Sequence, residues 1–126
     1  MLKIYFRVLR ILFQEFYSQS RCLTKALRLL LGGFDGVSRL DSVERYDPRM
    51  NTWVTVSPML SCRDGLSMKQ YGGWLYAVGG IDGPSYLNSV EYYDPLEDKW
   101  QETLQMKTSR AAAGVAVLPN LLDCEV

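Results

Sequence analysis

The pattern of apolar and polar residues changes character near residue 27. Downstream of that point, short apolar or alternating runs are separated by Gly, Pro and Asp, which is typical of strands joined by tight turns. These runs are residues 27–31, 40–46, 53–56, 65–71, 74–78, 87–93, 100–104 and 113–118. The segments between them are too short for the crossover helices that join parallel strands, so the pattern predicts antiparallel hairpins.

Residues 1–26 follow a different pattern. Their apolar positions include a set with spacings of 4, 3 and 4, which suits one face of a helix: Leu2, Phe6, Leu9 and Phe13. Arg7 and Arg10 interrupt the apolar core that a secretory signal needs, and the stretch is too short to span a membrane. We expect a short helix or a disordered segment here. A mitochondrial presequence and an interfacial membrane contact are the alternatives for this basic, acid-poor segment.

The most informative pattern is an internal repeat with a period of 47 residues. When residues 32–63 are laid over residues 79–110, fifteen of the thirty-two positions are identical without a gap. Unrelated sequences of ordinary composition would share roughly two. Each period holds four short strands and no helix, and a four-stranded antiparallel sheet repeated every 40–50 residues is typical of a β-propeller blade.

Composition and charge argue against several classes of functional site. The 126 residues contain no histidine, and Cys22, Cys62 and Cys124 are too widely spaced for a zinc site or a disulfide framework. We therefore predict no metal, no cofactor and no catalytic residue. Residues 32–126 carry eight basic and thirteen acidic residues, which does not favour nucleic-acid binding. Free cysteines are typical of a reducing compartment, and we expect a cytoplasmic protein.

The repeated residues also resemble a known family. In each period a Gly-Gly pair follows an apolar strand, then come Tyr-Asp-Pro, a Trp six residues after the Asp, a Met and an Arg. This order resembles the kelch repeat. The Asp-Gly that follows each glycine pair, and the Leu-x-Ser-Val-Glu at residues 40–44 and 87–91, resemble the kelch-like (BTB–kelch) substrate adaptors in particular.

The resemblance implies an all-β fold: a partial kelch β-propeller with about two four-stranded antiparallel blades and the first strand of a third. The expected divisions are residues 1–26 as a segment unlike kelch, 27–62 as repeat 1 without a clear first strand, 63–109 as repeat 2, and 110–126 as the start of a truncated repeat 3. Propellers of this family usually have six blades, so we expect a fragment or short isoform of a longer adaptor, here without its BTB domain.

Two sets of residues follow from the resemblance. The scaffold set holds the glycine pairs and the large side chains expected to fill the space between blades: Gly32, Gly33, Tyr46, Trp53, Met59, Gly79, Gly80, Tyr93, Trp100 and Met106. The partner-binding set lies on loops between the second and third strands and on the connections between blades: Asp35, Ser38, Arg39, Cys62, Arg63, Asp82, Ser85, Tyr86, Ser109 and Arg110. Within the second set, Arg39 and Tyr86 occupy the same repeat position but differ in chemistry.

The function that the resemblance implies is a protein–protein interaction module, as part of the substrate-recognition propeller of a cullin-RING ubiquitin ligase adaptor. The alternatives are a cytoskeletal scaffold that binds actin and a truncated product without independent function. Enzymes with kelch propellers exist, but the lack of histidine argues against their copper chemistry. The expected partner is a protein substrate or scaffold partner, and a blade left uncovered by neighbours favours self-association.

Overall fold

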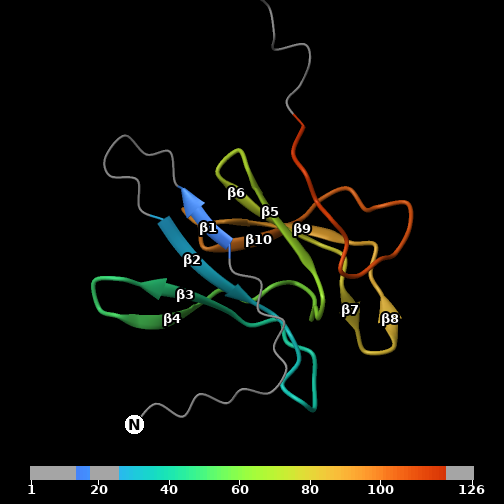
Figure 1. Ribbon diagram of the computed structural model, residues 1–126, viewed down its shortest axis with the longest axis horizontal. Coiled ribbons are helices and arrows are strands. Elements are labelled where there is room, and N and C mark those ends of the chain that lie inside the picture. Colours follow the sequence, from blue (N-terminus) through green and yellow to red (C-terminus); the bar gives the residue numbers. More distant parts are fainter. Residues whose placement is uncertain (1–13, 18–25, 119–126) are drawn as a thin grey trace, which may run out of the picture.

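The computed structural model describes residues 14–17 and 26–118 of the chain. In these ranges the protein consists of strands and turns, arranged as two four-stranded antiparallel sheets and a small hairpin (Figure 1). The first sheet, blade 1, has the order β1 (Gln14–Tyr17), β2 (Ala26–Leu31), β3 (Val43–Asp47) and β4 (Thr52–Val56). The second sheet, blade 2, has the order β5 (Ser67–Tyr71), β6 (Trp74–Val78), β9 (Val90–Asp94) and β10 (Lys99–Glu102). Two short strands, β7 (Ile81–Asp82) and β8 (Ser85–Tyr86), form the hairpin between β6 and β9. The prediction of an all-β fold with four-stranded antiparallel blades is confirmed.

The same turn chemistry closes the third and fourth strands of both blades. In the turn between β3 and β4, Asp47 Oδ1 accepts a hydrogen bond from the Arg49 amide at 2.8 Å. In the turn between β9 and β10, Asp94 Oδ1 accepts one from the Leu96 amide at 2.9 Å. The proline after each aspartate fixes φ for the next turn position. The local sequence Asp-Pro therefore determines where both strands end.

Cross-strand aromatic pairs lie at equivalent places in the two blades. Tyr46 faces Trp53 with ring centroids 5.4 Å apart, and Tyr93 faces Trp100 at 5.2 Å. The buried residues form one continuous core across both sheets: Leu29, Leu31, Val43, Met59, Leu66, Leu75, Ala77, Tyr93 and Trp100. The blades therefore pack face to face as one hydrophobic unit, as the resemblance to a propeller predicts.

Blade 1 has a first strand that the repeat did not reveal. β1 pairs with β2 in an antiparallel ladder, although it lies in residues 1–26, where we expected a helix or a disordered segment. The expectation is wrong for residues 14–17, and the rest of that expected helix lies outside the described residues. The 47-residue period places the counterpart of β5 at residues 20–24, whereas β1 comes several residues earlier. A strand is defined by the strand with which it pairs. Because β1 is shifted along the chain relative to the 47-residue period, comparison of the two repeats does not detect it.

The expected first strand of a third blade is not formed in the described residues. Residues 113–118 have no strand ladder there, although the Ala112 amide donates to the Gly65 carbonyl at 2.7 Å and the Ser67 hydroxyl donates to the Ala113 carbonyl. The chain thus leaves Arg110 and runs beside the start of β5. An extended segment becomes a strand only when a neighbour supplies a run of backbone partners.

Candidate functional site

The two kinds of predicted binding loop meet through backbone hydrogen bonds. The Gly33 amide donates to the Arg63 carbonyl at 2.8 Å, and the Arg63 amide donates to the Leu40 carbonyl at 3.0 Å. Blade 2 repeats the pattern, since the Gly80 amide donates to the Arg110 carbonyl at 3.0 Å. In each blade, the loop after the second strand is therefore tied to the connection that follows the fourth.

A third connection links the loops of the two blades. Asp64 and Ile81 exchange backbone hydrogen bonds at 3.0 and 2.8 Å in an isolated antiparallel bridge. The structure thus brings together residues 34–39, 61–64, 81–86 and 108–110, which we call the loop cluster. Seven of the predicted binding residues are exposed in it (Asp35, Ser38, Asp82, Ser85, Tyr86, Ser109 and Arg110), and Arg39 and Cys62 are half-buried.

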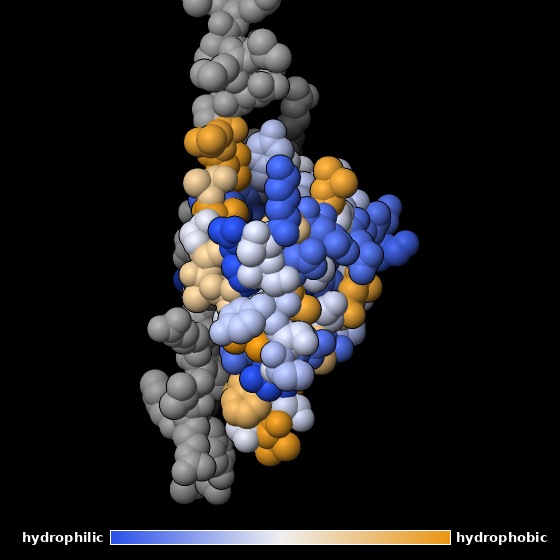
Figure 2. All heavy atoms as spheres, turned by 90° about the vertical axis from the view of Figure 1, so that its right-hand side faces the viewer, coloured by the Kyte–Doolittle hydropathy of each residue, from blue (hydrophilic) through white to orange (hydrophobic). Residues whose placement is uncertain are grey.

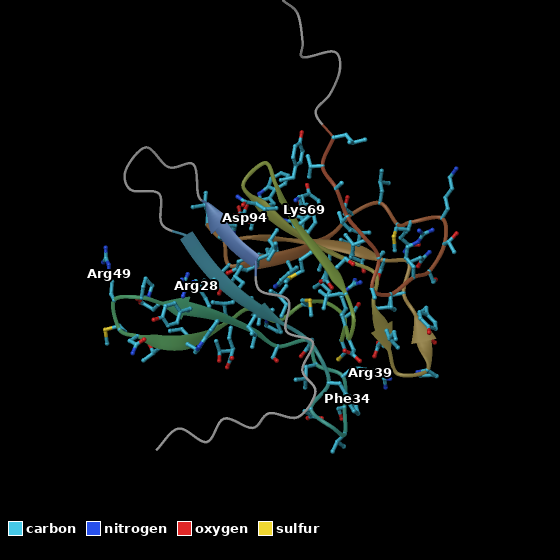
Figure 3. The ribbon with its side chains drawn as sticks, viewed as in Figure 1. Arg28, Phe34, Arg39, Arg49, Lys69 and Asp94 are labelled. Carbon is cyan, nitrogen blue, oxygen red and sulfur yellow. The ribbon has the colours of Figure 1, made fainter. Side chains whose placement is uncertain are left out.

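The loop of blade 1 is shaped by its aspartate. Asp35 Oδ1 accepts hydrogen bonds from the amides of Val37 and Ser38, both at 2.7 Å. These bonds, chiefly the one from Ser38, lower the pKa of Asp35 and keep the carboxylate ionised. The turn brings Phe34 and Arg39 opposite each other, and the guanidinium of Arg39 lies 5.4 Å from the centroid of the Phe34 ring (Figure 3). Asp35 therefore positions Arg39 as well as lining the surface.

The loop of blade 2 places a tyrosine where blade 1 has this arginine. The pair Ile81 and Tyr86 in the β7–β8 hairpin corresponds to the pair Phe34 and Arg39. Tyr86 is 61% exposed. Figure 2 shows the side of the molecule that carries this hairpin, where hydrophilic residues predominate and apolar side chains form separate small patches. An exposed tyrosine in a polar surface is suited to contact another protein.

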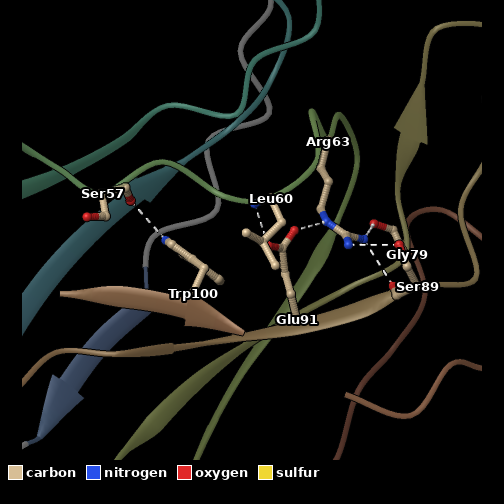
Figure 4. Close-up of polar contacts among 7 residues, drawn as sticks. All are labelled: Ser57, Leu60, Arg63, Gly79, Ser89, Glu91 and Trp100. Carbon is tan, nitrogen blue, oxygen red and sulfur yellow. Dashed lines mark hydrogen bonds and ion pairs between the residues drawn. The ribbon is translucent and has the colours of Figure 1, made fainter. Parts of the chain in front are cut away.

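Arg63 was predicted as a binding residue, and the structure places its side chain inside the protein. It is 1% exposed, and its guanidinium bonds to Glu91 Oε1 at 2.6 Å, the Gly79 carbonyl at 2.7 Å, the Ser89 carbonyl at 3.0 Å and Ser89 Oγ at 2.8 Å (Figure 4). A side chain with these partners has no surface left for another protein. Its inclusion among the binding residues is corrected: Arg63 connects the two blades.

Glu91 is the partner that the sequence analysis did not assign. It is completely buried, and its Oε2 also accepts a hydrogen bond from the Leu60 amide at 2.6 Å. Both carboxylate oxygens are thus satisfied from the connection that follows β4. A glutamate repeated at the same position of two equivalent strands, as Glu44 and Glu91 are, is a signal that could have identified it.

A second set of contacts joins the blades at their other end. Trp100 Nε1 donates to the Ser57 carbonyl at 2.9 Å, and the Ser57 amide donates to Asp98 Oδ1 at 3.0 Å. Asp98 Oδ1 also accepts the Tyr93 hydroxyl at 2.7 Å. Trp100 is 4% exposed, whereas Trp53, its counterpart in blade 1, is 40% exposed because the described residues place no sheet over that face.

These contacts predict a specific acid sensitivity. The hydrogen bond from Tyr93 and then the Ser57 amide lower the pKa of Asp98 below its ordinary value of 3.8. The ionised form therefore stabilises the fold fully above that value, and this contribution is lost as the pH falls through the lowered pKa. We expect Asp98→Asn to flatten the decline of unfolding free energy as the pH falls below about 4, measured by urea denaturation.

Blade 1 already contains an asparagine at the position equivalent to Asp98. Asn51 occupies the same position in blade 1, with φ of 51° against 50° for Asp98, and its Oδ1 likewise accepts a tyrosine hydroxyl at 2.7 Å. The variant should therefore keep the native turn at neutral pH. Equal slopes of stability against pH in the two proteins would contradict the role of Asp98.

Cys62 lies in the loop cluster as a free thiol. Burial raises its pKa first of all, and the charges of Asp41 and Asp82 raise it further. Because the thiolate is the reactive form of cysteine, this environment suppresses its nucleophilicity at neutral pH.

The described residues show neither a metal centre nor a spanning helix. In residues 14–17 and 26–118, no three side chains among Cys, Asp and Glu gather where they could hold a metal ion. Over the same ranges, no helix has the length and apolar character needed to cross a membrane.

Comparisons with known proteins agree with this architecture. The sequence model of the Kelch motif matches residues 29–60 and 63–103, which is more than half of the chain. The chain belongs to the kelch-repeat family.

Individual kelch-like proteins match over shorter stretches. Mouse Kelch-like protein 35 is 44% identical over 48 residues, which cover 38% of this chain and 8% of that protein. Human Kelch-like protein 35 is 42% identical over 48 residues, with the same coverage. Mouse Kelch-like protein 1 is 49% identical over 39 residues, or 31% of this chain and 5% of that protein. The chain therefore aligns with only a small part of these relatives, and the kelch repeats support a protein-interaction module.

Proposed function

We propose that the loop cluster is the surface with which this kelch module recognises a protein partner. The supporting observation is the bridge between Asp64 and Ile81, because it joins loops from both blades into one exposed surface. The strands themselves are occupied with packing, so the variable chemistry lies on the loops. The surface carries acidic residues, such as Asp35 and Asp82, as well as the basic residues Arg39 and Arg110, which suits a partner with mixed charge.

Arg39 and Tyr86 are the central residues of the proposed surface. Arg39 Nε is buried without a hydrogen-bond partner among the described residues, and its guanidinium is held over Phe34. A polar atom left unpaired in this way favours a partner that brings an acceptor. Tyr86 presents an exposed ring at the equivalent position. Arginine and tyrosine are also the residue types that most often dominate binding energy at interfaces.

The finer role that we propose is substrate recognition for a cullin-RING ubiquitin ligase adaptor. It is supported by the likeness to kelch-like proteins and by the match of both repeats to the Kelch motif. The free thiol of Cys62 supports a reducing compartment, and we propose the cytoplasm. We retain the divisions at residues 27–62 and 63–109 as the proposed repeats.

Arg39→Ala and Tyr86→Ala test the surface. Each is expected to lower partner affinity about tenfold or more, because truncation of a central hot-spot residue commonly costs over 1 kcal/mol. The tagged chain is purified from cells with each variant, and bound proteins are quantified by mass spectrometry. Partners that decrease with both variants are then measured directly with the purified chain.

Matched controls lie on the strand hairpins away from the loop cluster. Arg49→Ala removes an arginine from an exposed turn, and Tyr71→Ala removes a tyrosine from the exposed end of β5, so both should leave partner recovery unchanged. Unchanged recovery with Arg39→Ala and Tyr86→Ala would reject the surface. Co-sedimentation with actin filaments that depends on these two residues would keep the surface but replace the adaptor role with the cytoskeletal one.

A further inference from the structure

The contact between the two blades is made by residues that the chain carries twice. Arg63, from the connection after β4, bonds to Gly79, Ser89 and Glu91 of blade 2. At a distance of 47 residues the sequence repeats all four identities as Arg110, Gly32, Ser42 and Glu44. The arginine half of a second contact therefore follows blade 2, and the acceptor half lies on blade 1.

Neither half of the second contact is used by the described residues. Arg110 is exposed, whereas Arg63 is buried. Within residues 14–17 and 26–118, no hydrogen bond or ion pair joins the side chain of Arg110 or of Glu44 to another residue. The position 47 residues before Arg63 is Phe16, so the repeat supplies no arginine to Glu44. Glu44 itself lies half-buried on β3.

The acceptor half has the same backbone arrangement as the one already in use. The Gly32 amide donates to the Ser42 carbonyl at 2.9 Å, as the Gly79 amide donates to the Ser89 carbonyl at 3.1 Å. In blade 2 that Ser89 carbonyl also accepts from Arg63. The carbonyls of Gly32 and Ser42 are thus arranged to receive a second guanidinium.

The remaining contacts of the interface are also duplicated. Trp53 stands where Trp100 does and is 40% exposed, and Leu104 stands where Ser57 does and is 90% exposed. Asn51 replaces Asp98 but presents the same acceptor oxygen to a tyrosine hydroxyl. The residues that join blade 1 to blade 2 therefore have counterparts at the same repeat positions on the open faces of both blades.

We propose that a second copy of this chain docks head to tail, with Arg110 of one copy bound to Glu44, Ser42 and Gly32 of the next. The occupant is assigned from charge complementarity and from continuity with the interface that already joins the two blades. Such a contact uses different surfaces on each copy, so it continues until a ring closes or a filament forms. Propellers have typically four to eight blades, so a closed ring in which each copy contributes its two described blades would hold about two to four copies. Arg110 also belongs to the loop cluster, but this association does not use Arg39 or Tyr86, so the variants that test the two proposals differ.

Two variants used together give the sharpest test. Arg110→Glu places a carboxylate against Glu44 and the two carbonyls, and Glu44→Ala leaves Arg110 of the next copy without its counter-charge. Each is expected to weaken self-association of the full chain by about a hundredfold or more, since breaking a buried ion pair from one side is strongly unfavourable. The mass of the wild-type chain should increase with concentration in sedimentation velocity experiments, and that of each variant should remain near the monomer.

Mixing the two variants separates a lost interface from a lost fold. The Glu44→Ala chain keeps Arg110, and the Arg110→Glu chain keeps Glu44, so an equimolar mixture contains one intact contact. We expect a 1:1 dimer that does not grow further, because the remaining ends carry both substitutions. An unfolded variant could not restore this contact. Arg49→Glu and Glu97→Ala make the same chemical changes on exposed hairpin turns and should assemble like the wild type.

Three results would overturn the proposal. If the wild-type chain remains monomeric at every concentration, a second copy does not bind the open faces. Wild-type assembly by Arg110→Glu would show that another surface is responsible. A mixture of the two variants that remains monomeric would show that Arg110 and Glu44 do not meet.

Discussion

Replacing Arg63 with methionine is expected to lower the free energy of unfolding by about 3–5 kcal/mol, enough to unfold much of a marginally stable domain. The loss arises mainly because Glu91, which is completely buried, would keep its charge without a counter-ion. Three hydrogen bonds to Gly79 and Ser89 would also disappear. Urea denaturation followed by tryptophan fluorescence measures the change, since Trp100 lies in the same interface.

The double variant Arg63→Met with Glu91→Met isolates the cause. Removing both charges leaves no uncompensated carboxylate, so we expect the double variant to be more stable than Arg63→Met alone. Arg49→Met is the control, because the same substitution on an exposed turn should change stability by no more than about 0.5 kcal/mol. A loss of the same size from the double variant would assign the effect of Arg63 to its hydrogen bonds and packing.

Alanine at Gly79 is expected to destabilise the fold by about 2–5 kcal/mol, as the sum of two effects. A left-handed backbone conformation costs an alanine roughly 1–2 kcal/mol, and Gly79 has φ of +61°. Its Cβ would also collide with the Arg110 carbonyl oxygen, which must then move, and overpacking of this kind costs typically 1–3 kcal/mol. Thermal and urea unfolding measure the total.

Gly83 separates the two effects. It has nearly the same φ, +58°, but nothing lies within 4 Å of the position that a Cβ would take. Gly83→Ala should therefore show only the conformational cost of roughly 1–2 kcal/mol. If both variants lost the same stability, the close approach of the Arg110 carbonyl would not be the reason for glycine at position 79.

The sequence pattern located most of the strands, and those that it did not locate depend on pairing between strands. Turn residues and alternation place β3, β4, β9 and β10 correctly, because Asp-Pro turns and cross-strand aromatic pairs are local features. β1 was missed because its place in the sheet depends on pairing with β2 and not on the 47-residue period. The opposite happens at residues 113–118. Their apolar pattern suits a strand, but no neighbouring strand pairs with them in the described structure, so no ladder forms.

For the site, the sequence indicated which residue types occupy the loops, but it did not indicate which of them are exposed. The sequence indicates that Arg39 and Tyr86 share a repeat position, and the structure places them in equivalent paired positions. It treats Arg63 and Arg110 alike, since both end the same motif. Only the packing of blade 2 against blade 1 buries one and leaves the other exposed.

The sequence by itself determined the repeat, the four-stranded unit, the positions of the glycine pairs and the kelch family. The strands and turns follow from backbone preferences and side-chain alternation within a few residues of each other, and the family follows from the resemblance of the repeated residues. The tertiary structure alone decided that Glu91 receives Arg63, that Asp64 joins the loops of two blades, and that Trp100 is buried while Trp53 is not. Each of these depends on which sheet lies against the residue, and that contact joins segments far apart in the chain.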